Sequence, residues 1–92
     1  MFKNARNLNE FVTGLNDWRK MFNHRPLNIN HASDRQKIAN ALDAELSPEN
    51  LTCDGELPRS VVQARYNGLT KVCKELVKLD PSIKFYEFDF EA

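Results

Sequence analysis

Two helix starts and a tight turn lie within fifteen residues at the centre of this chain, in the segment Leu46–Ser60. Ser47 precedes Pro48, which places a capping hydroxyl before a proline at the first position of a helix. Gly55 tolerates a positive φ and predicts a turn, and Pro58 predicts the start of the next helix. This local chemistry determines how two helices are joined, so it constrains the fold more than any other segment does. It identifies no reaction.

The size of the chain predicts a single small domain that spans residues 1–92 and has one modest core. Hydrophobic residues make up 41% of the sequence, which is somewhat low for a globular domain and too high for a disordered chain. No apolar run approaches the roughly 18 residues that span a bilayer, and the first residues lack the apolar region of a secretory signal. We therefore expect a soluble, intracellular protein that does not contact a membrane.

A first helix is predicted over residues 8–22, where apolar residues repeat at three- and four-residue steps. Asn7 and Glu10 form a potential capping pair at its start. We interpret the apolar stripe of this helix as core, with Trp18 buried at its centre, rather than as a ligand site. The stripe consists of Leu8, Phe11, Val12, Leu15, Trp18, Met21 and Phe22.

Two further helices are predicted. The second spans about Asp34–Leu46, with Ser33 as its cap and Gln36 completing a capping box, and it is expected to lean on the first helix. The third spans about Pro58–Leu79 and ends before the Asp80–Pro81 pair, because a residue that precedes proline is disfavoured in the α conformation. The predicted core face of the third helix comprises Val62, Tyr66, Leu69, Cys73 and Leu76, flanked by Val61, Val72 and Val77.

The last segment, Ser82–Ala92, alternates in the manner of a β-strand and is rich in residues that favour strands. A lone strand needs a partner for its backbone groups. Three arrangements are open: pairing with Leu27–Asn30, pairing with a second copy in a homodimer, or docking as an extended aromatic tail. The predicted fold is therefore mainly α, a compact three-helix domain with a C-terminal β-strand or extended tail, and an α+β fold is the alternative.

Residue spacing does not indicate catalytic or metal chemistry. The metal-ligand candidates His24, His31, Cys53 and Cys73 lack the local pairs that zinc sites use. The sequence also lacks the nucleophile, phosphate-loop and metalloprotease motifs. We therefore predict a protein that is not an enzyme, that has no metal or cofactor, and that keeps both cysteines as free thiols.

Charged residues of the third helix are the first candidates for partner binding. The net charge of zero argues against a surface built entirely for nucleic acid. Lys71, Lys74 and Lys78 nevertheless form a line away from the predicted core face, and such a line suits a phosphate backbone or an acidic protein surface. The alternative is a solvated helix face. Arg65 projects into the apolar arc, so it either pairs with Glu45 or Glu49 or contacts a partner.

Aromatic residues near the end of the chain are the second candidates. The tail reads FYEFDFEA, and Phe88 and Phe90 are expected to anchor a partner if the chain does not bury them in its own core. Both uses are open, because a small domain needs its large apolar groups for packing. The predicted partner-binding residues are thus Lys71, Lys74, Lys78, Arg65, Phe88 and Phe90.

The segment Leu46–Leu76, and above all its ENLTCDGELPR stretch, resembles a segment of small, mostly uncharacterised accessory proteins of tailed bacteriophages and prophages. The resemblance covers about a third of the chain. It implies a phage gene product that acts in the cytoplasm of a bacterial host cell, where it binds and blocks a host protein or ribonucleoprotein complex. Anti-defence inhibitors, including anti-CRISPR proteins, are of this type. The alternative is a small nucleic-acid-binding or regulatory protein that uses the lysine-lined helix.

Overall fold

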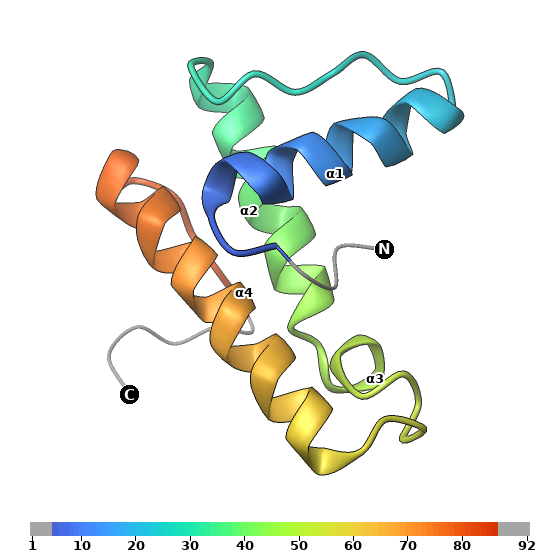
Figure 1. Cartoon of the computed structure of the whole chain (residues 1–92). Coiled ribbons are helices and arrows are strands. Elements are labelled where there is room, and N and C mark those ends of the chain that lie inside the picture. Colours follow the sequence, from blue (N-terminus) through green and yellow to red (C-terminus); the bar gives the residue numbers. More distant parts are fainter. Residues whose placement is uncertain (1–4, 87–92) are drawn as a thin grey trace.

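A computed structural model describes residues 5–86, which form four α-helices and no β-strand (Figure 1). The helices are α1 (Leu8–Met21), α2 (Ala32–Glu45), the single turn α3 (Pro48–Leu51) and α4 (Arg59–Leu79). The longest, α4, packs against each of the other three. The prediction of a compact, mainly helical chain is confirmed. Within residues 5–86, no helix combines the length and apolar character needed to cross a bilayer.

Helix α1 starts where the sequence predicts. The N–H of Glu10 donates to Asn7 Oδ1 at 2.9 Å, and Asn7 Nδ2 donates back to Glu10 Oε2 at 3.1 Å. Only the first half of its apolar stripe is buried. Trp18 is partly exposed, whereas Met21 and Phe22 are 77% and 56% exposed, so the prediction that this stripe is core throughout is wrong. The physical reason is that α1 runs away from α4, so its C-terminal end lies beyond the helix against which its first turns pack (Figure 1).

Helix α2 begins at Ala32, with His31 in the capping position and no side-chain cap. The predicted cap at Ser33 is therefore wrong, because Ser33 lies inside the first turn. Asp34 in that turn is buried and organises the preceding loop instead. Its carboxylate accepts from both terminal nitrogens of Arg25, at 2.6 and 2.9 Å, and from the N–H of Asn28 at 2.9 Å. The hydrogen bonds from Arg25 and Asn28 hold the pKa of Asp34 well below its usual range.

The core lies where α1 and α2 both pack on α4, so α2 packs chiefly on α4, whereas the sequence predicts that it leans on α1. Ile38 and Leu42 of α2 and Val72 and Leu76 of α4 are completely buried. Leu69 is 5% exposed, which confirms its predicted burial. The remaining buried apolar residues are Leu8, Phe11, Leu15, Leu27, Ala39, Leu46, Cys73 and Ile83.

The central segment folds as two helix starts joined by a turn, as the sequence predicts. Pro48 begins α3, and the Ser47 hydroxyl donates to the carbonyl of Ala44 at 2.8 Å rather than capping the helix. After α3 the backbone turns through three consecutive residues with positive φ, namely Cys53, Asp54 and Gly55 at 50°, 57° and 85°. The chain then enters α4.

Helix α4 runs from Arg59 to Leu79, and the extended backbone of Asp80 before Pro81 ends it as expected. Its predicted core face is only partly buried. Tyr66 is 42% exposed and Val61 is 40% exposed, so their assignment to the core and its flank is wrong. The first two turns of α4 lie beside α3, which is too short to cover them.

The segment after α4 is extended but is not a strand, so the predicted β-strand is wrong for residues 82–86, as is the short strand at 27–30. Side chains of α2 replace a partner strand. Gln36 donates to the carbonyl of Lys84 at 3.1 Å and accepts from its N–H at 3.2 Å. The N–H of Tyr86 donates to Asp43 Oδ2 at 2.6 Å. Pairing with residues 27–30 is therefore wrong for the described part of the tail, which contacts α2, whereas pairing with a second copy and docking of the aromatic residues beyond Tyr86 stay predictions.

Candidate interaction surfaces

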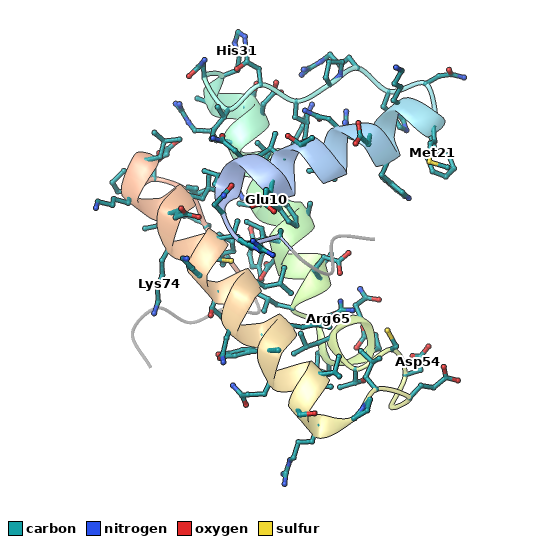
Figure 2. The ribbon with its side chains drawn as sticks, viewed as in Figure 1. Glu10, Met21, His31, Asp54, Arg65 and Lys74 are labelled. Carbon is teal, nitrogen blue, oxygen red and sulfur yellow. The ribbon has the colours of Figure 1, made fainter. Side chains whose placement is uncertain are left out.

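Three lysines of α4 form the first candidate surface, which we call the lysine face (Lys71, Lys74 and Lys78). All three side chains are exposed. They lie opposite Leu69 and Leu76, whose burial fixes how the helix is rotated. The view with side chains shows Lys74 projecting away from the helices into solvent (Figure 2). The structure thus presents the predicted line of ammonium groups at the surface.

The lysine face carries no compensating acid from its own helix. Glu75 is the only acidic residue of α4, and its carboxylate accepts from the N–H of Leu8 at 2.9 Å. This contact places the negative charge at the N-terminus of α1, where the helix dipole favours it. Within residues 5–86 the three lysines take part in no salt bridge. Every exposed charge on α4 is therefore positive.

Arg65 lies away from the lysine face, and its contacts join α4 to α2 and α3. Its side chain is 9% exposed, and its NH2 nitrogen lies 3.3 Å from Glu45 Oε2, which is one of the two predicted acidic partners. The same nitrogen reaches the carbonyl of Asn50, and NH1 contacts Cys53 Sγ at 4.0 Å. Figure 2 shows Arg65 between α4 and α3. The ion pair expected from its place in the apolar arc is therefore present.

An open groove of about 810 Å³ lies beside the first turns of α4. Its walls combine small or apolar side chains with three basic residues, Arg6, Arg65 and Lys71. Lys71 therefore belongs both to this groove and to the lysine face. The other lining residues are Ala5, Leu57, Ser60, Val61, Ala64, Gly68 and Leu69.

An aromatic cluster at the end of α1 is the second candidate surface, and sequence reasoning missed it. The rings of Trp18 and Phe22 have centroids 4.9 Å apart, and Met21 beside them is largely exposed. Such residues are enriched where proteins bind one another. Their regular spacing predicted a core face, and no signal in the sequence shows that the packing stops before they are reached.

The two predicted aromatic anchors, Phe88 and Phe90, lie outside the described residues. The described part of the tail ends at Tyr86, whose side chain is 83% exposed. Ile83 is buried, and Lys84 is exposed, so the alternation read from the sequence does hold up to this point.

Both cysteines are free, as predicted, and they differ in environment. Cys53 is partly buried in the turn after α3. Cys73 is completely buried between α2 and α4, where burial, together with the negative charge of Asp43, raises the pKa of its thiol to about 12. Cys73 therefore behaves as a small core residue. Among the described residues, no group of three or more potential metal ligands comes together.

Comparisons of this chain with protein-family models, with curated proteins and with solved structures gave no match. The resemblance over Leu46–Leu76 to phage accessory proteins therefore stays a prediction.

Proposed function

We propose that this is a non-enzymatic binding protein that docks on an acidic surface of a host protein complex through its lysine face. One observation carries the proposal: every exposed charge on α4 is positive, while its single acid, Glu75, is engaged by the backbone of α1. Clustered charge of one sign accelerates encounter with an oppositely charged partner and selects against others. The rotation of α4 that buries Leu69 also presents the lysines together.

A protein partner is favoured over nucleic acid by the side chains around the lysines. Binding to single strands normally adds aromatic rings on which bases stack. The N-terminal half of the same face instead carries Ser60, Gln63, Ala64 and Asn67. Phe22, which is exposed, and Trp18, which is partly exposed, lie elsewhere, at the end of α1, in a cluster typical of protein interfaces. The balanced net charge of the chain points the same way.

The biological setting that we propose follows the sequence resemblance. A phage accessory protein that acts in the bacterial cytoplasm and blocks a host complex, as anti-CRISPR and other anti-defence inhibitors do, needs a surface rather than a reactive site. A ribonucleoprotein complex offers both acidic protein and phosphate. The nucleic-acid alternative is retained for this reason, because the same three ammonium groups suit phosphates.

The test is capture of a partner from a bacterial host lysate by the wild type and by the triple variant Lys71→Glu, Lys74→Glu, Lys78→Glu. The variant should remain folded, because an exposed substitution usually changes stability by less than about 0.5 kcal/mol. It should lose the partner, since attraction becomes repulsion at each contact. Circular dichroism checks the fold, and mass spectrometry identifies the captured proteins.

A matched pair of double variants separates the lysine face from net charge. Lys74→Glu with Lys78→Glu should lose the partner, whereas Lys20→Glu with Lys37→Glu alters net charge equally at exposed sites elsewhere and should retain it. Equal capture by the folded triple variant and the wild type would refute the proposal. Loss of capture after nuclease treatment, with a steep dependence on salt, would instead support the nucleic-acid alternative.

A further inference from the structure

The buried guanidinium of Arg65 lacks a full set of hydrogen-bond partners. Its side chain is only 9% exposed, and its Nε–H is buried and finds no acceptor within residues 5–86. The bonds that its terminal nitrogens form to oxygen are long, at 3.3 Å to Glu45 and 3.5 Å to the carbonyl of Asn50. The guanidinium of Arg25, in contrast, lies 2.6 Å from its carboxylate partner. Because a buried donor without an acceptor is unfavourable, the surroundings of Arg65 are short of an acceptor.

Arg65 lines the groove beside α4, and the charge of that groove is positive. Two further cations, Arg6 and Lys71, lie in its walls, and none of the described lining residues is acidic. Both side chains are exposed, and neither forms a salt bridge within the described part of the chain. Glu45, the partner of Arg65, does not line the groove. The groove therefore presents uncompensated positive charge to a ligand with anionic oxygens.

Small side chains along α4 allow the backbone of a ligand to approach the groove closely. Ser60, Ala64 and Gly68 are four residues apart, so they share one side of the helix. A Cβ added at Gly68 would meet the carbonyl oxygen of Ala5 at 3.5 Å, so the segment that leads into α1 lies against this side of α4 (Figure 1). From Ser60 to Lys71 the helix rises about 16 Å, which is the length of about five residues of extended chain.

The walls of the groove favour a peptide over a nucleic acid. Val61 is 40% exposed and Leu57 is partly exposed, so both offer apolar contact to a ligand. None of the described lining residues is aromatic, whereas single nucleic-acid strands normally bind where aromatic rings stack on the bases. The Nε–H of an arginine and one terminal N–H form a fork that matches the two oxygens of a carboxylate. An acidic side chain with apolar neighbours fits this combination.

We propose that the groove binds a short, extended acidic segment of a partner protein, with one carboxylate accepting from Nε of Arg65. Arg6 and Lys71 contact a second acidic side chain of the segment, and its apolar side chains pack on Val61. The guanidinium turns slightly toward the groove on binding, which its long bond to Glu45 allows. The ligand class follows from the groove alone, whereas the assignment of the segment to the partner of the lysine face rests on the proposed function.

NMR titration of the full chain labelled with nitrogen-15 tests the site at Arg65 itself. The probe is the capped peptide acetyl-Ala-Val-Glu-Val-Glu-amide, and the matched control carries Gln in place of both Glu residues. The Nε–H resonance of Arg65 should move and saturate with the acidic peptide, because a carboxylate becomes its acceptor. The neutral peptide should bind at least about tenfold more weakly, because it forms no hydrogen bond between charged groups.

Two substitutions at exposed positions of α4 test the groove without changing Arg65. Ala64→Phe places a ring in the groove, whereas Gln63→Phe places the same ring on a residue that does not line it. Ala64→Phe should weaken binding of the acidic peptide at least about tenfold, because the ring occupies the space of the ligand. Gln63→Phe should change the affinity by less than about twofold. Circular dichroism checks that both variants are folded, and the comparison of the two peptides on the wild type needs neither variant.

Three results would overturn the inference. They are an unmoved Arg65 resonance, equal affinities for the two peptides, and saturation of the Arg65 shift by inorganic phosphate at a concentration at least about tenfold lower than that of the acidic peptide. The last result would assign the groove to a ligand that carries phosphate. Lysate capture by Ala64→Phe that equals capture by Gln63→Phe would refute the assignment of the segment to the partner of the lysine face.

The variant Lys74→Glu with Lys78→Glu separates the groove from the lysine face. Both lysines lie outside the groove, so the variant should bind the acidic peptide within about threefold of the wild type at physiological salt. Peptide binding in the groove, with lysate capture that is indifferent to the Lys→Glu changes, would remove the proposed function alone. Capture that needs the lysines, without a shift of the Arg65 resonance by the peptide, would remove this inference alone.

Discussion

Leu69 and Leu79 allow the packing of α4 to be tested with one chemical change at two sites. Leu69 is 5% exposed and lies in the core, whereas Leu79 at the end of the same helix is 52% exposed. Replacing either with alanine removes three carbon atoms and leaves a good helix former in place. Any difference in cost between the two variants therefore reports burial.

The expected costs follow from that burial. Three buried carbon groups at about 0.8 kcal/mol each give about 2.4 kcal/mol for Leu69→Ala from transfer alone. The cavity left between α4 and its neighbours raises the total to about 3–5 kcal/mol. At Leu79 about half of the side chain is already in water and no closed cavity forms, so the cost should be about 1 kcal/mol.

Urea unfolding followed by circular dichroism at 222 nm measures both values. A domain of 92 residues has a free energy of unfolding of about 5–14 kcal/mol, so Leu69→Ala should remove a large share of it. The slope of unfolding free energy against urea should not change. Costs that agree within about 1 kcal/mol would show that α4 is not rotated as described, and the lysine face would then lose its structural basis.

Three other perturbations have defined outcomes. A thiol reagent should label Cys53 in the native protein and Cys73 only after unfolding, because Cys73 is buried and the pKa of its thiol is raised. Mass spectrometry measures the rate of labelling at each site, and equal rates in the native protein would contradict the burial of Cys73. The pKa of Asp34 is depressed when folded, so its contribution to stability is present above the ordinary carboxyl value of about 3.9 and is lost as pH falls below it. Denaturation midpoints of Asp34→Asn should therefore depend less on pH between 6 and 2 than those of the wild type, and identical profiles would contradict the role of its pairing with Arg25. Gly55→Ala should cost about 1–2 kcal/mol in urea unfolding because φ is +85° there, and an unchanged midpoint would contradict that backbone geometry.

Helix positions were largely predictable because their signals are local. The reciprocal bonds of Asn7 and Glu10 and the stop at Asp80 involve residues three apart or adjacent in the chain. The prediction that Ser33 caps α2 is wrong: the helix begins at Ala32, and its first turn is held by Asp34, whose carboxylate accepts from Arg25 and from the N–H of Asn28. A capping pattern can be read in the sequence, whereas competition from a distant side chain cannot.

The candidate surfaces likewise combine features that the sequence determines with contacts that only the fold shows. The order of residues along α4 determines that three lysines share one side of the helix, and these lysines make that side positively charged. Only the fold shows that Glu75 is engaged by α1, which leaves the exposed charge of α4 uniformly positive, and that Glu45 rather than Glu49 is the partner of Arg65. Both contacts join residues far apart in the chain.

Periodicity determined which side of each helix is apolar, but tertiary structure decided how much of that side is covered. Phe22 and Tyr66 continue their stripes and yet stay exposed, and Trp18 is only partly buried, because no neighbouring helix covers them fully. The tail was likewise apolar on alternate residues, and the fold satisfied its backbone with Gln36 and Asp43 rather than with a strand. Local sequence sets the period of a segment, whereas the length and position of its neighbours set its burial.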